Sequence, residues 1–292
     1  MYVSVNNQII SFNLMSGEIR KNYSIETSNL QKHHSMFIGP KCPLFILDQG
    51  FNVYEVYQND DLSDGENKNY RKKLYLEGSV VNCFYDIVLG TFIVVSKNSI
   101  CQVRNDKNNS FNTLNTINLE GFAPIILSCF CEKTKTVTLL TGDQMVYQFK
   151  NYSYFIEKGF KFVFPKDLTE HEDRFIIGIH YDYVYDIFVI FSNKNELYFV
   201  SRQGDCQVYF NIIANMPAKL KELKFIAFKY QLIKGRKGMP PEPYILVHDD
   251  SGFLVQFSLA KIFEEFGMDI RLEDVKMKAM FKDTQTMTNE NY

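Results

Sequence analysis

The chain has 292 residues, of which 46% are hydrophobic, and it contains 26 Phe, 18 Tyr and no Trp. A chain of this length can bury a sizeable core, and abundant aromatic rings favour strands because they pack well on a pleated surface. The 32 Lys and Arg residues nearly balance the 34 Asp and Glu residues, so the formal charge of -2 excludes a molecule-wide attraction to nucleic acid or to an anionic membrane.

The first residues predict a strand and no targeting signal. Residues 1–5 read Met-Tyr-Val-Ser-Val, without the basic and long apolar regions of a secretory signal. No run of about 18 apolar residues predicts a membrane span. The six cysteines lie in strand-like segments without the spacing of a disulfide framework, which predicts reduced thiols in an intracellular protein of the cytoplasm or nucleus. They are Cys42, Cys83, Cys101, Cys129, Cys131 and Cys206.

One hairpin pattern recurs along the chain. Each copy is an apolar strand, a short polar turn and a second apolar strand, and the clearest copy spans residues 186–205. In that copy Ile187, Val189 and Phe191 fall on every second position, which is the signal of a half-buried strand. A polar turn at residues 193–195 follows. The returning strands of six copies start near Ile9, Phe51, Ile100, Met145, Leu197 and Leu254.

Further apolar runs precede and follow the hairpins, so that each copy extends to about four strands. A four-stranded unit cannot bury both of its faces alone, whereas units stacked around an axis bury one another. The repeat therefore predicts a closed ring of sheets. The runs that precede hairpins are residues 80–84, 125–130, 175–181 and 223–228, and those that follow are residues 74–76, 111–119, 155–164 and 206–212.

The copy at residues 186–205 resembles the two middle strands of a WD40 propeller blade. Val200 and Ser201 stand where that family places Trp and Asp, and the copies recur at steps of about 42 to 57 residues, near or above the WD40 period. The resemblance implies an all-β fold with a single propeller of six four-stranded blades, seven being the alternative, over residues 1–259. The family's Trp position is held by Phe12, Tyr54, Val103, Gln148, Val200 and Phe257.

The first copy begins at its second blade strand, so we expect its innermost strand to come from the segment after Leu259 or from another polypeptide. Residues 260–281 instead carry apolar side chains at helical spacings, and residues 282–292 are polar and expected to be disordered. We interpret 260–292 as a short helical and disordered tail. Its apolar side chains either pack on the propeller rim or dock a partner, and the candidates for docking are Ile262, Phe263 and Phe266.

No pattern in the chain predicts catalysis. His180 and Asp182 are interpreted as a pair that hydrogen-bonds inside a blade, as the WD40 resemblance implies, and His248 with the following aspartates as part of a turn. The adjacent histidines at 33 and 34 are expected in a solvated loop, and Cys129 and Cys131 as core thiols, because neither pair has further ligands at zinc spacing. Phosphate-loop, nucleophile-elbow and zinc-protease motifs are missing. We therefore expect a protein that is not an enzyme and has no cofactor or metal.

A basic region supplies the second set of candidate binding residues. Residues 219–237 are rich in Lys and Arg, and only Glu222 opposes them. Such a region can contact nucleic-acid phosphates or an acidic partner, although it is more often a solvated loop. A second loop, residues 58–66, is acidic. The basic candidates are Lys219, Lys221, Lys224, Lys234, Arg236 and Lys237.

The sequence thus favours a non-catalytic propeller that acts as a scaffold or adaptor between protein subunits of a larger intracellular complex, with no membrane contact. An RNA- or DNA-contacting propeller that uses residues 219–237 is the alternative. A hydrolase with a metal in the central channel is the third hypothesis.

Overall fold

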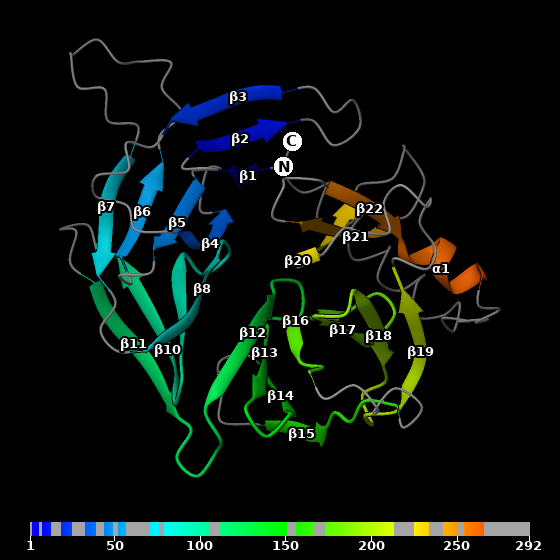
Figure 1. Ribbon diagram of the computed structural model, residues 1–292. Helices are drawn as coiled ribbons and strands as arrows, with labels where there is room; N and C mark the ends of the chain where they lie inside the picture. Colours follow the sequence, from blue (N-terminus) through cyan, green and yellow to red (C-terminus); the bar gives the residue numbers. More distant parts are fainter. Residues whose placement is uncertain are drawn as a thin grey trace, which may run out of the picture. The chain divides into compact units, whose positions relative to one another are not determined.

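The computed structural model describes residues 2–5, 8–12, 19–24, 33–38, 44–48, 52–56, 70–75, 79–105, 111–150, 156–165, 173–212, 225–233, 242–249 and 254–265. They form 22 strands and one short helix (Figure 1). Contacts along the chain divide it into two compact units, residues 1–161 and residues 162–292. The two units are described separately below.

Unit 1, residues 1–161, holds four antiparallel sheets, and the strands of each sheet pair in chain order. Sheet A consists of β1 (Tyr2–Val5), β2 (Gln8–Phe12) and β3 (Ile19–Ser24). Sheet B consists of β4 (His33–Ile38), β5 (Leu44–Asp48), β6 (Asn52–Val56) and β7 (Tyr70–Tyr75). Sheet C consists of β8 (Val80–Asp86), β9 (Thr91–Ser96), β10 (Ser99–Asn105) and β11 (Phe111–Asn118). Sheet D consists of β12 (Ile125–Cys131), β13 (Thr136–Thr141), β14 (Met145–Lys150) and β15 (Ile156–Lys161).

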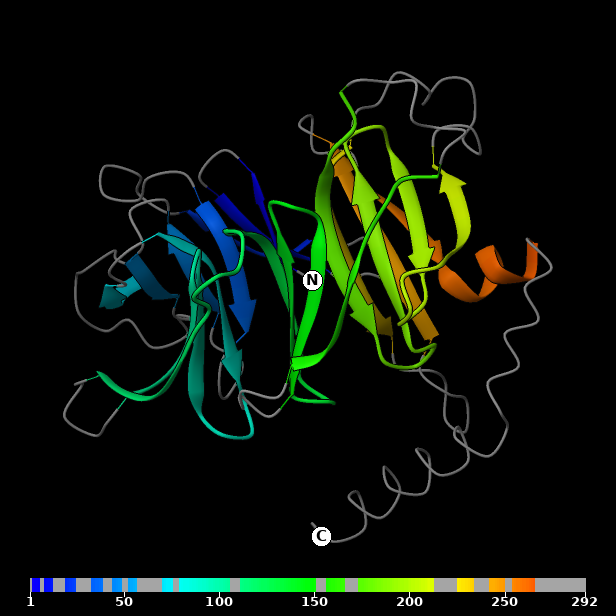
Figure 2. The same ribbon diagram turned by 90° about the horizontal axis from the view of Figure 1, so that it is seen from below.

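Unit 2, residues 162–292, holds two further antiparallel sheets and the helix. Sheet E consists of β16 (Ile176–Asp182), β17 (Ile187–Ser192), β18 (Glu196–Val200) and β19 (Cys206–Asn211). Sheet F consists of β20 (Phe225–Ile233), β21 (Glu242–Asp249) and β22 (Leu254–Ser258), and α1 (Leu259–Glu265) follows it directly. Figure 2 shows the two sheets of this unit beside one another, with α1 in orange at their edge.

The six predicted hairpins are confirmed by the strand pairing. Their returning strands are β2, β6, β10, β14, β18 and β22, and each pairs with the strand before it. These are third strands in sheets B to F, whereas β2 is the second strand of sheet A. Sheet A therefore begins one strand later than the other sheets, as the sequence predicted.

The alignment of the copies is also confirmed by the places where the pairing is irregular. The register of the returning strand against the next strand shifts beside Phe12, Tyr54, Val103, Gln148 and Val200. These five residues are those that the sequence resemblance aligns with the Trp of WD40 repeats. A bulge turns a side chain out of the regular alternation and increases the local twist. The copies therefore share a backbone feature at this position although their side chains differ.

The prediction of half-buried strands is wrong, because both faces of the middle strands are covered. All six residues of β17 and all five residues of β18 are buried. In sheet C, Phe92 and Val94 join a core with sheet B, while Ile93 and Val95 join a core with sheet D. In sheet C the middle strand β9 thus lies between sheets B and D, and the usual contrast between an apolar and a polar face is lost.

Three local predictions concern the two adjacent histidines, the acidic loop and the tail. The adjacent His33 and His34 begin strand β4, so they are not in a loop. The acidic segment 58–66 lies outside the described residues. The helix observed in the tail begins at Leu259 and packs on unit 2, and the rest of the predicted tail also lies outside the described residues.

Candidate interaction site

Two sheets carry the same turn between their first and second strands. Turn C, residues 86–90, joins β8 to β9, and turn E, residues 182–186, joins β16 to β17. Each turn begins with a fully buried Asp that follows a Tyr. Each ends on a left-handed residue, Gly90 with a φ of 64° or Asp186 with a φ of 56°. Such a last residue lets a four-residue loop return the chain into the next strand.

The carboxylate of Asp86 fixes the backbone of turn C. Its Oδ1 accepts hydrogen bonds from the backbone N–H groups of Val88, at 3.0 Å, and Leu89, at 3.1 Å. The same oxygen lies 2.6 Å from Nζ of Lys135, which ends the corresponding turn of sheet D. Asp86 is fully buried and the Lys135 side chain is 21% exposed. A buried carboxylate needs such partners, and here they tie the turn to the adjacent sheet.

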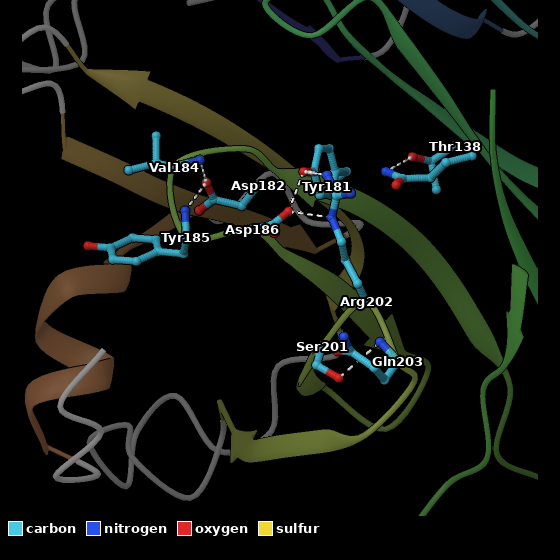
Figure 3. Close-up of polar contacts among 10 residues, drawn as sticks. Thr138, Tyr181, Asp182, Val184, Tyr185, Asp186, Ser201, Arg202 and Gln203 are labelled. Carbon is cyan, nitrogen blue, oxygen red and sulfur yellow. Dashed lines mark hydrogen bonds and ion pairs between the residues drawn. The ribbon is translucent and has the colours of Figure 1, made fainter. Parts of the chain in front are cut away.

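Turn E uses the same cap, as Figure 3 shows. Oδ1 of Asp182 accepts hydrogen bonds from the backbone N–H groups of Val184, at 2.7 Å, and Tyr185, at 3.3 Å. An aspartate that bonds to the backbone two and three residues ahead is a common way to stabilise a turn. The sequence predicted a hydrogen bond between Asp182 and His180 inside the blade and did not predict this turn cap.

Turn E differs from turn C in a polar cluster at its end. Asp186 Oδ1 accepts a hydrogen bond from the hydroxyl of Tyr181, at 2.5 Å, and one from Nε of Arg202, at 2.6 Å (Figure 3). Arg202 also donates to the Tyr181 hydroxyl, at 2.6 Å, and lies over its ring. Burial and the bond to Asp186 raise the pKa of Tyr181. The cluster therefore keeps a protonated phenol and is suited to holding the turn.

The cover over the two turns also differs. Tyr185 of turn E packs against Phe263 of α1, with ring centroids 4.9 Å apart, and Figure 3 draws it beside the helix. In turn C the side chains of Ile87, Val88 and Leu89 are 46%, 75% and 44% exposed. Three consecutive exposed apolar side chains are unusual at a protein surface. Turn C is therefore the candidate interaction site.

Another polar cluster lies at the opposite end of sheet E, and this one is buried. Glu196 accepts hydrogen bonds from Arg174, at 2.9 Å, and from the hydroxyls of Ser192 and Tyr198, both at 2.6 Å. The side chains of Arg174 and Glu196 are only 6% and 3% exposed. Because the carboxylate is enclosed by three donors, its geometry suits a structural role in the turn between β17 and β18.

The predicted basic region stays a prediction. Its candidates Lys219, Lys221, Lys224, Lys234, Arg236 and Lys237 all lie outside the described residues. Only the strand between them, β20, is described.

Two of the predicted docking residues in the tail are covered by the chain itself. Ile262 and Phe263 are 4% and 3% exposed and belong to a core with strands of sheets E and F. This is the rim packing that the sequence offered as the alternative to docking. Phe266 lies outside the described residues.

The other candidates for chemistry do not assemble into a site. The described part of the chain holds no group of three or more His, Cys, Asp or Glu residues that could bind a metal ion. Cys129 and Cys131 are buried free thiols, as predicted. No helix among the described residues has the length and apolar character to cross a bilayer.

Turn C was not predicted from the sequence, because no single motif marks it and only a comparison of two segments of the chain reveals it. Tyr85-Asp86 and Tyr181-Asp182 each precede a short apolar stretch and then a strand of similar sequence. Aligning these two stretches by themselves would have shown the shared turn. It would not have shown that one turn is covered and the other exposed, because that depends on where the helix after β22 packs.

Comparisons with known proteins identify the fold and no family. No family model and no curated protein matches the chain. The solved structures of BBS1N in complex with ARL6DN are similar: in the crystal soaked with lead the identity is 9%, the TM-score is 0.51, and the match covers 86% of this chain and 70% of that chain. In the crystal soaked with mercury the identity is 10%, the TM-score is 0.49, and the coverage is 86% and 73%.

The chain has a β-propeller-like fold, built mainly of four-stranded antiparallel sheets. In all, 1110 chains of solved structures are similar to it. A fold shared so widely does not indicate one function, because function depends on the residues at the site.

Proposed function

We propose that the protein is a non-catalytic β-propeller scaffold that binds other protein subunits of a larger intracellular complex, in the cytoplasm or the nucleus. The observation that carries this proposal is the exposure of Ile87, Val88 and Leu89 on a turn that Asp86 and Lys135 fix in place. A rigid apolar tip suits binding, because little conformational entropy is lost when a partner covers it.

The six sheets correspond to six blades of one ring in this proposal. Among the described residues, sheet A lacks the first strand that sheets B to F have, and β1 pairs only with β2. The other edge of β1 can accept one further strand, from the rest of this chain or from a partner, by the main-chain pairing that strand addition uses. BBS1N, which has a similar fold, was crystallised in complex with ARL6DN, and this supports a role in protein binding for the present chain.

A tagged pull-down from the source cells tests the proposal. The full chain is captured at moderate salt, half of the sample is treated with nuclease, and the bound proteins are quantified by mass spectrometry. The proposal predicts stoichiometric protein partners that survive the nuclease. A chain that comes down alone would contradict the scaffold function.

The pull-down also tests the nucleic-acid hypothesis, and a metal assay of the purified chain tests the hydrolase hypothesis. Partners that disappear with nuclease would favour nucleic-acid binding, and reversal of Lys234, Arg236 and Lys237 to Glu should then abolish it with a steep dependence on salt. Tight stoichiometric calcium or zinc in the purified chain would favour the metal-dependent hydrolase. Either result would replace the scaffold proposal.

A further inference from the structure

Helix α1 covers turn E by means of one apolar face. Leu259, Ile262 and Phe263 are buried and have the spacing that places side chains on one side of a helix. The Phe263 ring meets the ring of Tyr185 edge to face, at 4.9 Å and 76°, and the ring of Phe199 at 5.1 Å and 71°. Edge-to-face contacts of this kind add to the stabilisation from burial alone.

Turn C has the same backbone frame as turn E. In both turns the aspartate caps the N–H groups two and three residues ahead, and the last residue is left-handed. Leu89 therefore occupies the position of Tyr185. A side chain at this position in unit 2 meets an aromatic residue of a helix, whereas Leu89 is 44% exposed.

We propose that turn C is a docking site for an amphipathic helix of a partner protein, which packs an aromatic side chain against Leu89 as α1 packs Phe263 against Tyr185. The inference rests on the scaffold function and names the partner element at the same site. The partner helix carries apolar residues three and four positions apart, as α1 does. A lipid surface is the competing occupant, and the chain's formal charge of -2 gives it no general attraction to anionic lipid.

The test uses a synthetic helix as the probe. The peptide contains three tandem copies of Leu-Ala-Lys-Ile-Phe-Glu-Glu, the sequence of α1, which gives about 21 residues, enough for helix formation. A second peptide has Ser in place of each Phe. The full chain carries the photo-crosslinking residue p-benzoyl-phenylalanine in place of Val88, or in place of Leu114 as the matched control. Leu114 is an apolar residue of sheet C that is 47% exposed.

The inference predicts crosslinking of the Phe peptide from position 88 and not from position 114. The affinity of the chain for this peptide, measured by fluorescence anisotropy, should fall about tenfold or more in Val88→Asp. It should stay unchanged in Leu114→Asp, and the Ser peptide should bind more weakly. Val88 is 75% exposed, so the variant should keep its fold, and circular dichroism checks this.

Equal crosslinking from both positions, or full affinity in Val88→Asp, would overturn the inference. So would flotation of the chain with vesicles of phosphatidylcholine and phosphatidylserine that Val88→Asp abolishes, because the turn would then bind lipid. The pull-down separates this failure from failure of the scaffold function. Stoichiometric partners that Val88→Asp retains would leave the scaffold in place and remove turn C as its docking site.

Discussion

Turn C and turn E are two copies of one structure in two different surroundings. Both are capped by a buried aspartate, yet turn C is tied to its neighbour by Lys135 and turn E by a helix. One therefore presents its apolar side chains and the other covers them. The difference shows that a repeated backbone can be kept while the surface above it changes.

Removing the cover from turn E should have the largest effect on stability. Phe263 is 3% exposed and contacts two aromatic rings, so Phe263→Ala is expected to lower the free energy of unfolding by about 3–5 kcal/mol. Leu89→Ala, at the exposed equivalent of Tyr185, should change it by less than about 0.5 kcal/mol. Urea unfolding followed by circular dichroism measures both. Similar losses in the two variants would mean that turn C is covered in solution.

For the two ion pairs at the turns, the larger loss of stability is expected at turn C. Lys135→Met leaves the fully buried Asp86 without its cation, and we expect a loss of about 2 kcal/mol, less than for a pair with both partners buried. Arg202→Met at turn E should cost less than about 1 kcal/mol, because Arg202 and Asp186 are 43% and 50% exposed. The same unfolding experiment compares them. Adding Asp86→Asn to Lys135→Met should recover part of the loss, since the carboxylate charge is then gone.

Alkaline pH should separate the tyrosines that precede the two aspartates. Burial, and then the hydrogen bond to Asp186, raise the pKa of Tyr181. The folded chain thus keeps a proton that the unfolded chain loses near pH 10. This contribution to stability is present below about pH 10 and is lost as the pH rises further. Tyr181→Phe should therefore show a shallower fall in stability between about pH 9 and pH 11.

Tyr85→Phe is the matched control for this pH dependence. Burial and Asp86 also raise the pKa of Tyr85, but position 90 is Gly, and turn C has no counterpart of the Asp186 carboxylate there. Its effect on the alkaline slope should be smaller. An equal effect of Tyr85→Phe and Tyr181→Phe on the alkaline slope would mean that the hydrogen bond to Asp186 contributes nothing to the pH dependence.

A further effect concerns the left-handed residue at the end of each turn. Gly90→Ala places a side chain at a φ of 64°, which should cost about 1 kcal/mol. The space itself is open, because the nearest atom to an added Cβ is the Tyr85 hydroxyl oxygen at 3.6 Å. Asp186→Gly should lose less stability than Gly90→Ala. It relieves the backbone strain at a positive φ, and this gain partly offsets the loss of the contacts of Asp186 with Tyr181 and Arg202. Unfolding curves of the two variants test this order.

The hairpins could be predicted from the sequence because local patterns determine them. Alternating apolar runs and polar turns located all six returning strands, and the bulges fall on the residues aligned with the family Trp. The strand that begins with His33 was missed, because its two polar residues resemble a loop and only pairing with β5 makes them a strand.

The site could not be predicted in the same way. The exposure of Val88 and the burial of Phe263 depend on which sheets and which helix pack against each turn, and those contacts join residues far apart in the chain. Lys135 and Asp86 likewise meet only because sheets C and D are neighbours. Apolar residues in a turn suggest burial when read alone, so the exposed tip became visible only in the folded chain.

Hydroxyl-radical footprinting of the free chain and of its purified assembly tests the central claim most directly, because it reports the exposure of individual side chains. Labelling of Ile87, Val88 and Leu89 should fall several-fold in the assembly, whereas labelling of Tyr185, which packs against α1, should change little. Unchanged labelling of turn C in an assembly that contains stoichiometric partners would contradict the claim.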